Sequence, residues 1–388
     1  MQIYIKLWYS YNNIVRISVV KYFFHLPLQA IYHLLCPPIM LFHCFFSLPT
    51  NLFLYYGTHD KKNAYICACK DTLSNIHIMA NHRHAYLIMA HNEWQLLNTL
   101  LSLIDDERND IFLHIDKTVK EMPQLFKPLH AKLFFTPKRY DVRWGDVGQV
   151  LSEMHLFKTA HDHGPYQYYH KLSGVDLPIK TQDYIHDFFD KHEGKEFIGF
   201  FTLTDFIKGD IERKRRRYYL LMKYNYRTPF VAKWKVMAAK LIRHAALKIQ
   251  DWIHYDRGNE LTFRTGHNWV SLTEEAVTYL LDNEDFISKR FAYTTCGDEM
   301  YKHSMLISNP KFKERIFDLD NGIHSCMRFI DFLRASEEQQ KRGEPYNWQD
   351  DDAEELLKSE YLFARKFSSK YPKVIKDIEE YLKRETGK

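Results

Sequence analysis

Cysteine is scarce in this chain. Only six of its 388 residues are cysteines, and only Cys296 and Cys326 lie beyond residue 84. Two cysteines cannot build the disulfide framework of a secreted domain, so a reducing compartment fits this composition best. Cys67 and Cys69 form a close pair, but neither His nor Cys follows at zinc-finger spacing, which argues against a metal site there.

Internal repeats and low-complexity linkers are also absent from the sequence. Their absence excludes solenoid architectures and a string of tethered modules. At 388 residues, with 45% hydrophobic and 15% aromatic residues, the chain is long enough and apolar enough for a large core. We therefore predict one large folded domain, residues 79–388, after a separate N-terminal segment, residues 1–78.

Charged residues are missing from residues 22–59, which contain no Lys, Arg, Asp or Glu. This length exceeds the ~20 residues that a membrane-spanning helix needs, although several prolines and histidines interrupt the stretch. Three interpretations stay open: a membrane anchor, an interfacial hairpin, or an upstream translated segment that is not part of the working protein. Met79 stands just before the first patterned block and motivates the third. The apolar region is too long for a signal peptide and has no small-residue cleavage site.

A strong charge of one sign is absent too. The net charge of +5 fits an acidic ligand such as a nucleotide diphosphate, or an anionic membrane surface, as well as ordinary solubility, and it does not require nucleic acid. The run Arg213-Lys-Arg-Arg-Arg217 is most typical of a solvated helix face; an acceptor-side or membrane-surface role is the alternative.

Short apolar runs alternate with helical patterns between residues 84 and 200. Buried strands are predicted at residues 84–90, 111–115, 133–135, 166–170 and 196–201, and helices over residues 94–104 and 147–160. Each strand is followed by a polar turn. This alternation predicts an α/β fold with a mostly parallel sheet flanked by helices, in which the strand ends carry the site.

The region after residue 258 predicts further elements. Residues 265–272 look like a strand entering the site. Thr273 with Glu274 and Glu275 marks the beginning of a capped helix. Residues 218–258 read as helical, basic and aromatic. Cys296-Gly-Asp-Glu-Met300 places two adjacent carboxylates after a glycine turn and before another helix.

Several blocks occur together in the order and spacing of one family. The chain resembles the core-2/I-branching glycosyltransferases, which include β-1,6-N-acetylglucosaminyltransferases and peptide O-xylosyltransferases. The resemblance covers about residues 84–370 and rests on these blocks: His84-Ala-Tyr-Leu-Ile-Met-Ala-His-Asn92, Phe112-Leu-His-Ile-Asp-Lys117, Arg143-Trp-Gly-Asp146, Lys171-Leu-Ser-Gly-Val-Asp-Leu-Pro178 and Leu362-Phe-Ala-Arg-Lys-Phe367.

The resemblance implies a GT-A-like fold and an inverting transferase. Such an enzyme moves GlcNAc or xylose from a UDP-sugar to a hydroxyl of a glycan or of a Ser/Thr-bearing protein, with neither a cofactor nor a metal ion. Because the catalytic region has few cysteines, we expect a membrane-associated enzyme whose catalytic domain lies in the cytoplasm; a Golgi type II membrane protein is the alternative.

An inverting transferase needs a base for the acceptor hydroxyl, since an alcohol is a poor nucleophile. By resemblance, Glu299 is that base and Asp298 is its neighbour at the helix start. Capping of the following helix is the structural alternative for both carboxylates. The sequence places Arg213, Trp269 and Asp298 as candidate acceptor contacts.

The departing diphosphate needs a counter-charge, and the resembling family uses basic side chains for it. Lys366 matches the family's phosphate-binding lysine, with Arg365 beside it. The partner arginine of the family falls near Arg342, with Lys341 as the alternative, although the local pattern departs from the animal members here. An exposed helix end is the other interpretation of Arg365 and Lys366.

Asp116 resembles the residue that contacts the nucleotide, and Trp144 lies in the donor-side loop, where an aromatic ring can pack on sugar or base. A structural turn is the alternative role for Asp116. Asp176 is expected to order its loop through backbone hydrogen bonds.

Two rival functions remain. One is a non-catalytic, membrane-attached protein that binds sugars or nucleotides. The other is a hydrolase, which would need two carboxylates facing each other across the sugar; adjacent Asp298 and Glu299 do not suggest that geometry.

Overall fold

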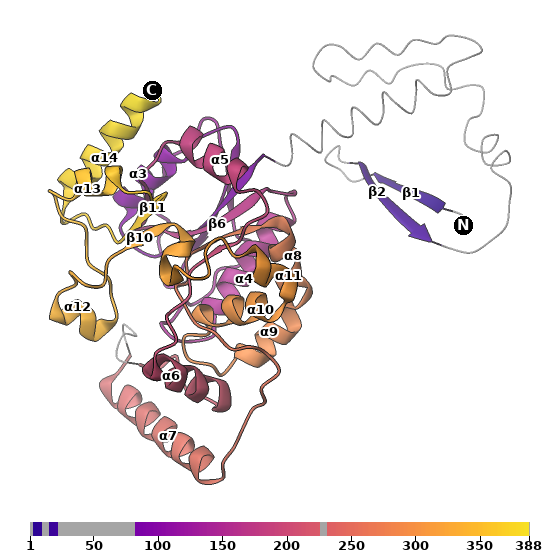
Figure 1. Ribbon diagram of the computed structural model, residues 1–388, viewed down its shortest axis with the longest axis vertical. Helices are drawn as coiled ribbons and strands as arrows, with labels where there is room; N and C mark the ends of the chain where they lie inside the picture. The colour runs from indigo at the N-terminus through magenta and orange to yellow at the C-terminus, as the bar shows by residue number, and fades with distance from the viewer. Residues whose placement is uncertain (1–2, 10–14, 22–81, 226–230, 388) are drawn as a thin grey trace. The chain divides into compact units, whose positions relative to one another are not determined.

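The computed structural model describes residues 3–9, 15–21, 82–225 and 231–387 (Figure 1). The chain divides into two compact units, residues 1–63 and 64–388. In the first unit, β1 (Ile3–Tyr9) pairs antiparallel with β2 (Val15–Lys21). The uncharged stretch of residues 22–59 and Met79 lie outside the described residues. Among the described residues, no helix is both long and apolar enough to cross a membrane.

The second unit is built on a six-stranded sheet with the order β5-β4-β3-β6-β9-β8. The first four strands in this order are parallel, whereas β9 runs antiparallel to both β6 and β8. The expected mixed α/β fold with a mostly parallel sheet is thus confirmed. The strands are β3 (His84–Ala90), β4 (Asn109–Ile115), β5 (Lys132–Phe135), β6 (Tyr168–Ser173), β8 (Phe197–Ile198) and β9 (Val270–Thr273).

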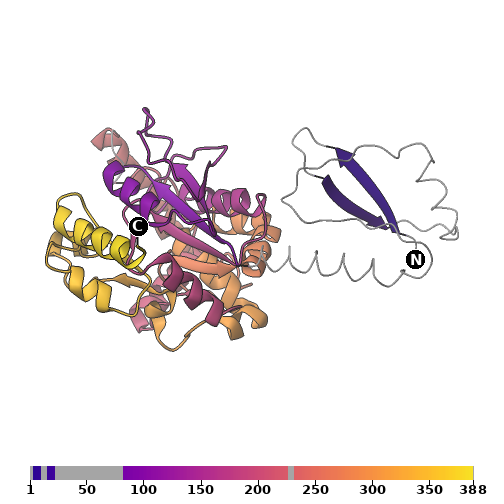
Figure 2. The same ribbon diagram turned by 90° about the horizontal axis from the view of Figure 1, so that it is seen from above.

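Helices cover both faces of this sheet because its strands are apolar on both sides. On β3, Tyr86 and Ile88 point into one core, which α3 (Trp94–Leu103), α5 (Gln182–Lys191), α13 (Ala353–Lys358) and α14 (Pro372–Glu385) complete. Ala85 and Leu87 point into the other core, which lies against α4 (Gly148–His161), α8 (Glu274–Asp282) and α10 (Tyr301–Ser308). Figure 2 shows the sheet between these two groups.

A second, three-stranded sheet has the order β10-β11-β7. Its strands are β10 (Arg328–Ile330), β11 (Phe363–Arg365) and β7 (Leu177–Pro178), and β11 places Arg365 beside the loop that follows β6. The remaining elements are α6 (Asp205–Arg216), α7 (Lys233–Trp252), α9 (Glu284–Phe291), η1 (Gly297–Glu299), α11 (Pro310–Arg315), η2 (Gly322–Cys326) and α12 (Glu337–Arg342).

Local signals placed some elements better than others. The Thr273 side chain caps α8 by accepting a hydrogen bond from the amide of Ala276, as expected. The helix expected over residues 218–258 is shorter. Only α7 is helical there, and its flanking segments in the described chain are irregular. The basic and aromatic composition persists through these flanks, so composition alone did not mark the helix ends.

Candidate active site

The parallel strands β3, β4 and β6 end at one edge of the sheet, and their following loops border a cleft of about 730 Å³. Ligands of α/β sheets characteristically bind at this edge. The cleft is also bordered by residues 142–144, 267–269, 298–299, 343–345, 347, 365–368 and 370.

Most of the predicted site residues meet in this cleft although they come from distant parts of the chain. Two predicted residues, Arg213 and Arg342, are not among those lining it. The predicted residues that line the cleft are Asp116, Trp144, Trp269, Asp298, Glu299, Arg365 and Lys366.

Arg342 and Arg213 both lie on exposed helix faces. Arg342 forms an ion pair with Glu338 one turn earlier on α12, and Arg213 pairs with Asp210 on α6 at 3.4 Å. Both pairs link residues three or four positions apart along a helix, which is the ordinary arrangement of a solvated helix face. Gly343 and Glu344, directly after α12, do line the cleft.

Glu299 is held in place through its backbone. Its carbonyl accepts hydrogen bonds from the amide of Gly266 at 3.1 Å and from the Thr265 hydroxyl at 3.0 Å. A side chain at residue 266 would collide with the Gly199 carbonyl, 1.9 Å from the position of a Cβ atom. Gly266 is therefore required for the close contact that fixes the residue carrying the candidate base.

The Glu299 carboxyl is half-buried, and this environment changes its acidity. Burial raises the pKa of Glu299 to about 7, with Asp298 contributing in the same direction, while Lys214 and Lys302 oppose the shift. A carboxyl that titrates near neutrality can accept a proton and release it again at physiological pH.

Asp298 connects the loops that hold the site through one of its carboxylate oxygens. Its Oδ2 atom accepts hydrogen bonds from Gln149 at 3.0 Å and from Asn268 at 2.9 Å. Burial also raises the pKa of Asp298. Because the nearby side chains bond to this carboxylate, Asp298 orders the loops around Glu299.

Beneath Asp298 lies a buried ion cluster that the sequence reasoning missed. Glu153 of α4 pairs with Lys302 of α10 at 2.6 Å and with Lys171 of β6 at 3.4 Å, and all three side chains are inaccessible to solvent. Lys302 also donates to Asn268 at 2.7 Å. One signal was available: Glu153 falls on the predicted apolar face of α4, where an acid needs a partner.

Lys214 is a second functional candidate that the sequence reasoning missed. It pairs with Asp210 at 2.8 Å and is nearly buried, unlike its neighbour Arg213. Burial by itself would lower the pKa of Lys214, but Cys296, Asp210 and Glu299 outweigh that effect and raise it. Helical periodicity within the run 213–217 could have separated the inward Lys214 from its solvated neighbours.

Basic side chains from the segment around β11 also line the cleft. The Arg365 guanidinium donates to Asp176 at 2.6 Å and lies over the Trp269 ring, 4.2 Å from its centroid. Lys366 is half-buried, 3.6 Å from the Glu344 carboxylate, and burial lowers its pKa. Arg365 is thus fixed by its partners, and the Lys366 ammonium lies within ion-pair distance of Glu344.

Asp176 and Asp116 both order loops. Asp176 accepts from the amide of Ser173 at 2.7 Å, which confirms its expected role. The two Asp116 oxygens accept from the amides of Thr118 at 2.7 Å and Val142 at 2.9 Å, so this carboxylate joins two loops at the cleft wall. These bonds support the structural role of Asp116 and place it at the cleft as well.

Trp144 lies at the rim of the cleft, and its side chain is 43% exposed. Its carbonyl accepts a hydrogen bond from Asn225 at 2.9 Å.

His91, His114, Arg143 and Lys370 also line the cleft, and none of them was singled out from the sequence. Burial lowers the pKa of His91 and that of His114, the latter to about 4, so both rings favour the neutral form near pH 7.

The cleft geometry can now be set against known families. A family model described as Core-2/I-Branching enzyme matches residues 84–356. The chain belongs to the Core-2/I-Branching enzyme family. As a family member it is a glycosyltransferase that uses a sugar donor and a glycan acceptor. Glu299 and the loops after β3, β4 and β6 lie inside the matched range, and Lys366 lies just beyond it. A comparison with curated proteins gives no match to this chain.

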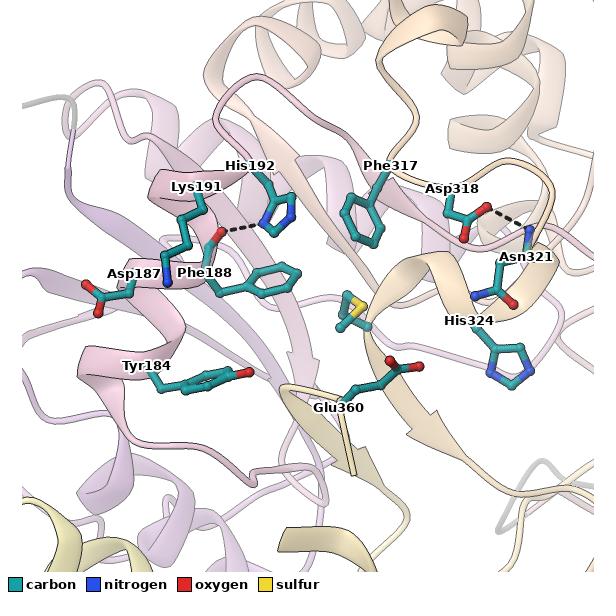
Figure 3. Close-up of a pocket in the computed structure, with 11 residues that line it drawn as sticks. Tyr184, Asp187, Phe188, Lys191, His192, Phe317, Asp318, Asn321, His324 and Glu360 are labelled. Carbon is teal, nitrogen blue, oxygen red and sulfur yellow. Dashed lines mark hydrogen bonds between the residues drawn. The ribbon is translucent and has the colours of Figure 1, made fainter. Parts of the chain in front are cut away.

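A second cavity, of about 520 Å³, contains none of the predicted site residues (Figure 3). It lies between α5 and the segment that contains η2, with Phe188 and Phe317 among its walls. His192 hydrogen-bonds the Phe188 carbonyl at 2.8 Å, and Asp318 accepts from the amide of Asn321 at 2.9 Å. These two side chains are engaged in local backbone structure. Among the described residues, no group of three or more His, Cys, Asp or Glu side chains is arranged to hold a metal ion.

Proposed function

We propose that this glycosyltransferase is an inverting, metal-independent enzyme of the GT-A type that transfers GlcNAc or xylose from a UDP-sugar to a hydroxyl group. The observation that carries the proposal is the shared cleft. Glu299, with a pKa of about 7, lines this cleft together with Lys366 and the ordered Arg365. A base and fixed cations in one cavity are what an inverting displacement needs.

In the proposed reaction, the ionised Glu299 carboxylate accepts the proton of the acceptor hydroxyl. The acceptor oxygen forms a bond to the anomeric carbon while the bond from that carbon to the UDP oxygen breaks. UDP leaves with the electron pair and gains negative charge. The Lys366 ammonium stabilises this charge, and Glu299 later releases its proton to solvent.

Arg342 can supply positive charge to the diphosphate only if its side chain rearranges. Its pair with Glu338 would have to break, and its side chain would have to turn from the face of α12 toward the loop at Gly343. Arg143 and Lys370 already line the cleft and provide positive charge there. We therefore propose Lys366 as the principal diphosphate-binding cation and Arg342 as a residue recruited only when donor is bound.

Substitution of the candidate base tests the proposal. Glu299→Gln keeps the size and the backbone contacts of the residue but cannot accept a proton. We expect transfer to fall by about 100-fold or more, while UDP binding by calorimetry is unchanged. The exposed Glu314 on α11 offers a matched control, because Glu314→Gln makes the same chemical change outside the cleft. Wild-type turnover in Glu299→Gln would show that Glu299 is not the base.

The donor and the metal independence are tested by one assay. UDP release is measured against a panel of UDP-sugars, with a glycan or a Ser/Thr peptide as acceptor, in the presence and absence of EDTA. Release that survives EDTA supports fixed cations as the counter-charge. Binding of UDP-sugars with no release in any combination would favour the alternative, a non-catalytic sugar- or nucleotide-binding protein.

The compartment is also a proposal. Cys296 and Cys326 are buried free thiols, which fits a catalytic domain kept in a reducing cytoplasm and associated with a membrane. The alternative, a Golgi type II membrane protein, would place the same domain in the lumen. Localisation of the full chain relative to the membrane, by protease protection of intact vesicles, distinguishes them.

A further inference from the structure

Helix α7 carries an apolar stripe that faces away from the protein. The side chains of Trp234, Leu241 and Trp252 are 68%, 71% and 80% exposed, and those of Met237 and Ile249 are also largely exposed. These residues recur at helical spacing and so lie along one face of α7. Large exposed apolar residues aligned in this way are unusual on a soluble surface and indicate a contact.

The opposite face of α7 attaches the helix to the rest of the domain. Ala239 is buried, and Arg243 donates to the carbonyl of Leu220 at 2.8 Å. Gln250 bonds both the amide and the carbonyl of Tyr218, at 2.7 and 3.0 Å. Figure 1 shows α7 beyond α6 at the outer edge of the domain. The inner face of α7 thus contacts the rest of the domain, and the apolar stripe on the outer face stays exposed.

The charges of α7 suggest what covers the stripe. Its 20 residues include five Lys or Arg and one acid, Asp251. Four of the five basic residues, Lys233, Lys235, Lys240 and Lys248, are exposed, and helical spacing puts Lys233 and Lys240 on one flank of the stripe and Lys235 on the other. A Trp stands near each end of the helix. An apolar stripe flanked by Lys, with Trp at the ends, is the pattern of a helix that lies in the plane of a membrane interface.

We propose that α7 docks the catalytic domain on an anionic lipid surface, with Trp234, Leu241 and Trp252 inserted at the headgroup level. Its mixed polarity suits a helix that lies on a bilayer, and α7 is not apolar enough to cross one. The lysines then meet anionic headgroups. A protein groove could also accept the apolar stripe, but it would give no special reason for Trp at both ends and Lys along the flank.

The docking surface is connected to the cleft. The chain enters α7 after α6, which carries Lys214 toward Glu299, and Asn225 bonds the Trp144 carbonyl between the two helices. Docking of α7 would thus hold the cleft at a fixed height above the lipid. The proposal concerns where the catalytic domain binds, and it does not depend on which sugar the enzyme transfers.

The test must separate α7 from the apolar N-terminal stretch of the same chain. Fluorescence of the full-length protein is measured with vesicles of brominated anionic phospholipid, which quench tryptophans in contact with acyl chains. The variant Trp234→Phe/Trp252→Phe keeps the stripe apolar and leaves the other five tryptophans in place. We expect clear quenching in the wild type and a loss of most of it in the variant. Equal quenching of the two proteins, or no binding of the wild type to these vesicles, would overturn the proposal.

A second variant pair measures affinity. Leu241→Glu/Trp252→Glu replaces two stripe residues, and Leu129→Glu/Leu333→Glu makes the same change at two exposed apolar residues elsewhere. Vesicle titrations that follow Trp234 quenching should weaken about tenfold or more in the first and stay near wild type in the second. UDP release with a soluble acceptor should be unchanged in both. If instead the wild type is a dimer that the first variant converts to a monomer in the absence of lipid, a second copy covers the stripe and the lipid proposal is wrong.

Discussion

At the scale of single residues, function depends on how neighbouring side chains change the pKa of one carboxyl group. Glu299 and Glu314 have the same side chain, yet only Glu299 is placed against Asp298 in a half-buried position beside Lys214. The burial that raises its pKa makes it a stronger base near pH 7, and the lysines keep it from becoming permanently protonated. Its chemistry thus comes from partners on α6 and α10.

We predict that kcat/KM of the enzyme rises with pH and levels off above about pH 7, so that the pH–rate profile has an acidic limb near pH 7. The sign follows from the role of Glu299: it must be ionised to accept a proton, and its pKa is raised to about 7. Below that value, activity should fall about tenfold per pH unit. A pH–rate profile with saturating donor checks this. A flat profile between pH 5.5 and 8 would exclude Glu299 as the titrating base.

Replacement of Lys214 should move that limb. Lys214→Met removes a positive charge that lowers the pKa of Glu299, so the limb is expected at higher pH with a similar plateau. At pH 6.5 the loss should be roughly three- to tenfold. Lys208→Met is the matched control, because Lys208 lies on the same helix and forms an exposed ion pair with Asp205. An equal loss at every pH would mean that Lys214 acts by some route other than the acidity of Glu299.

At the scale of elements, the site depends on how strands and helices are joined. Glu153 of α4, Lys171 of β6 and Lys302 of α10 form one buried cluster, and Asn268 connects it to Asp298. Removal of one member of such a cluster leaves an uncompensated charge in the interior. The cluster therefore links the stability of three elements to the geometry of the cleft.

We predict that Glu153→Gln destabilises the protein by about 3–5 kcal/mol, because two buried lysines lose their counter-charge. Denaturant unfolding followed by circular dichroism measures this. Glu275→Gln breaks exposed ion pairs with Lys311 and Arg315 and should cost no more than about 1 kcal/mol. A similar small cost for both variants would show that the buried lysines are neutral in the folded state.

At the scale of the whole molecule, the chain has two compact units, and the family match lies entirely in the second. Within the described residues, the six-stranded sheet, both cores and the cleft are built from residues after 82. The described contacts of the cleft include no residue from the first unit. We therefore predict that the catalytic unit folds without the N-terminal segment.

A protein that begins at Met79 should accordingly fold and retain donor turnover within about twofold of the full chain, since the described residues of its two cores all lie beyond residue 84. Thermal unfolding and UDP release measure the two properties. The full chain assayed under identical conditions is the control. If the shorter protein is unfolded or inactive, residues 1–78 are part of the working enzyme and the proposed division at residue 79 is wrong.

Much of the fold was readable from the sequence because its signals are local. The apolar runs at β3 and β4, the spacing of apolar residues on α3, and Thr273 as a cap each depend on neighbours only a few positions away. The order of family motifs added the class of activity and singled out Glu299 and Lys366. Alternation of strands and helices also predicted which edge of the sheet carries the site.

Tertiary structure alone decided which charges share the cleft. Arg213 and Lys214 are adjacent in a basic run, but α6 turns one toward solvent and the other toward Glu299. Arg342 forms an ion pair on the surface of α12, and Glu153 finds two lysines that lie 18 and 149 positions away. Long-range pairing and burial set these outcomes. The energy of a charged side chain depends on its solvent exposure and on the charges near it in space, and a local sequence pattern contains neither.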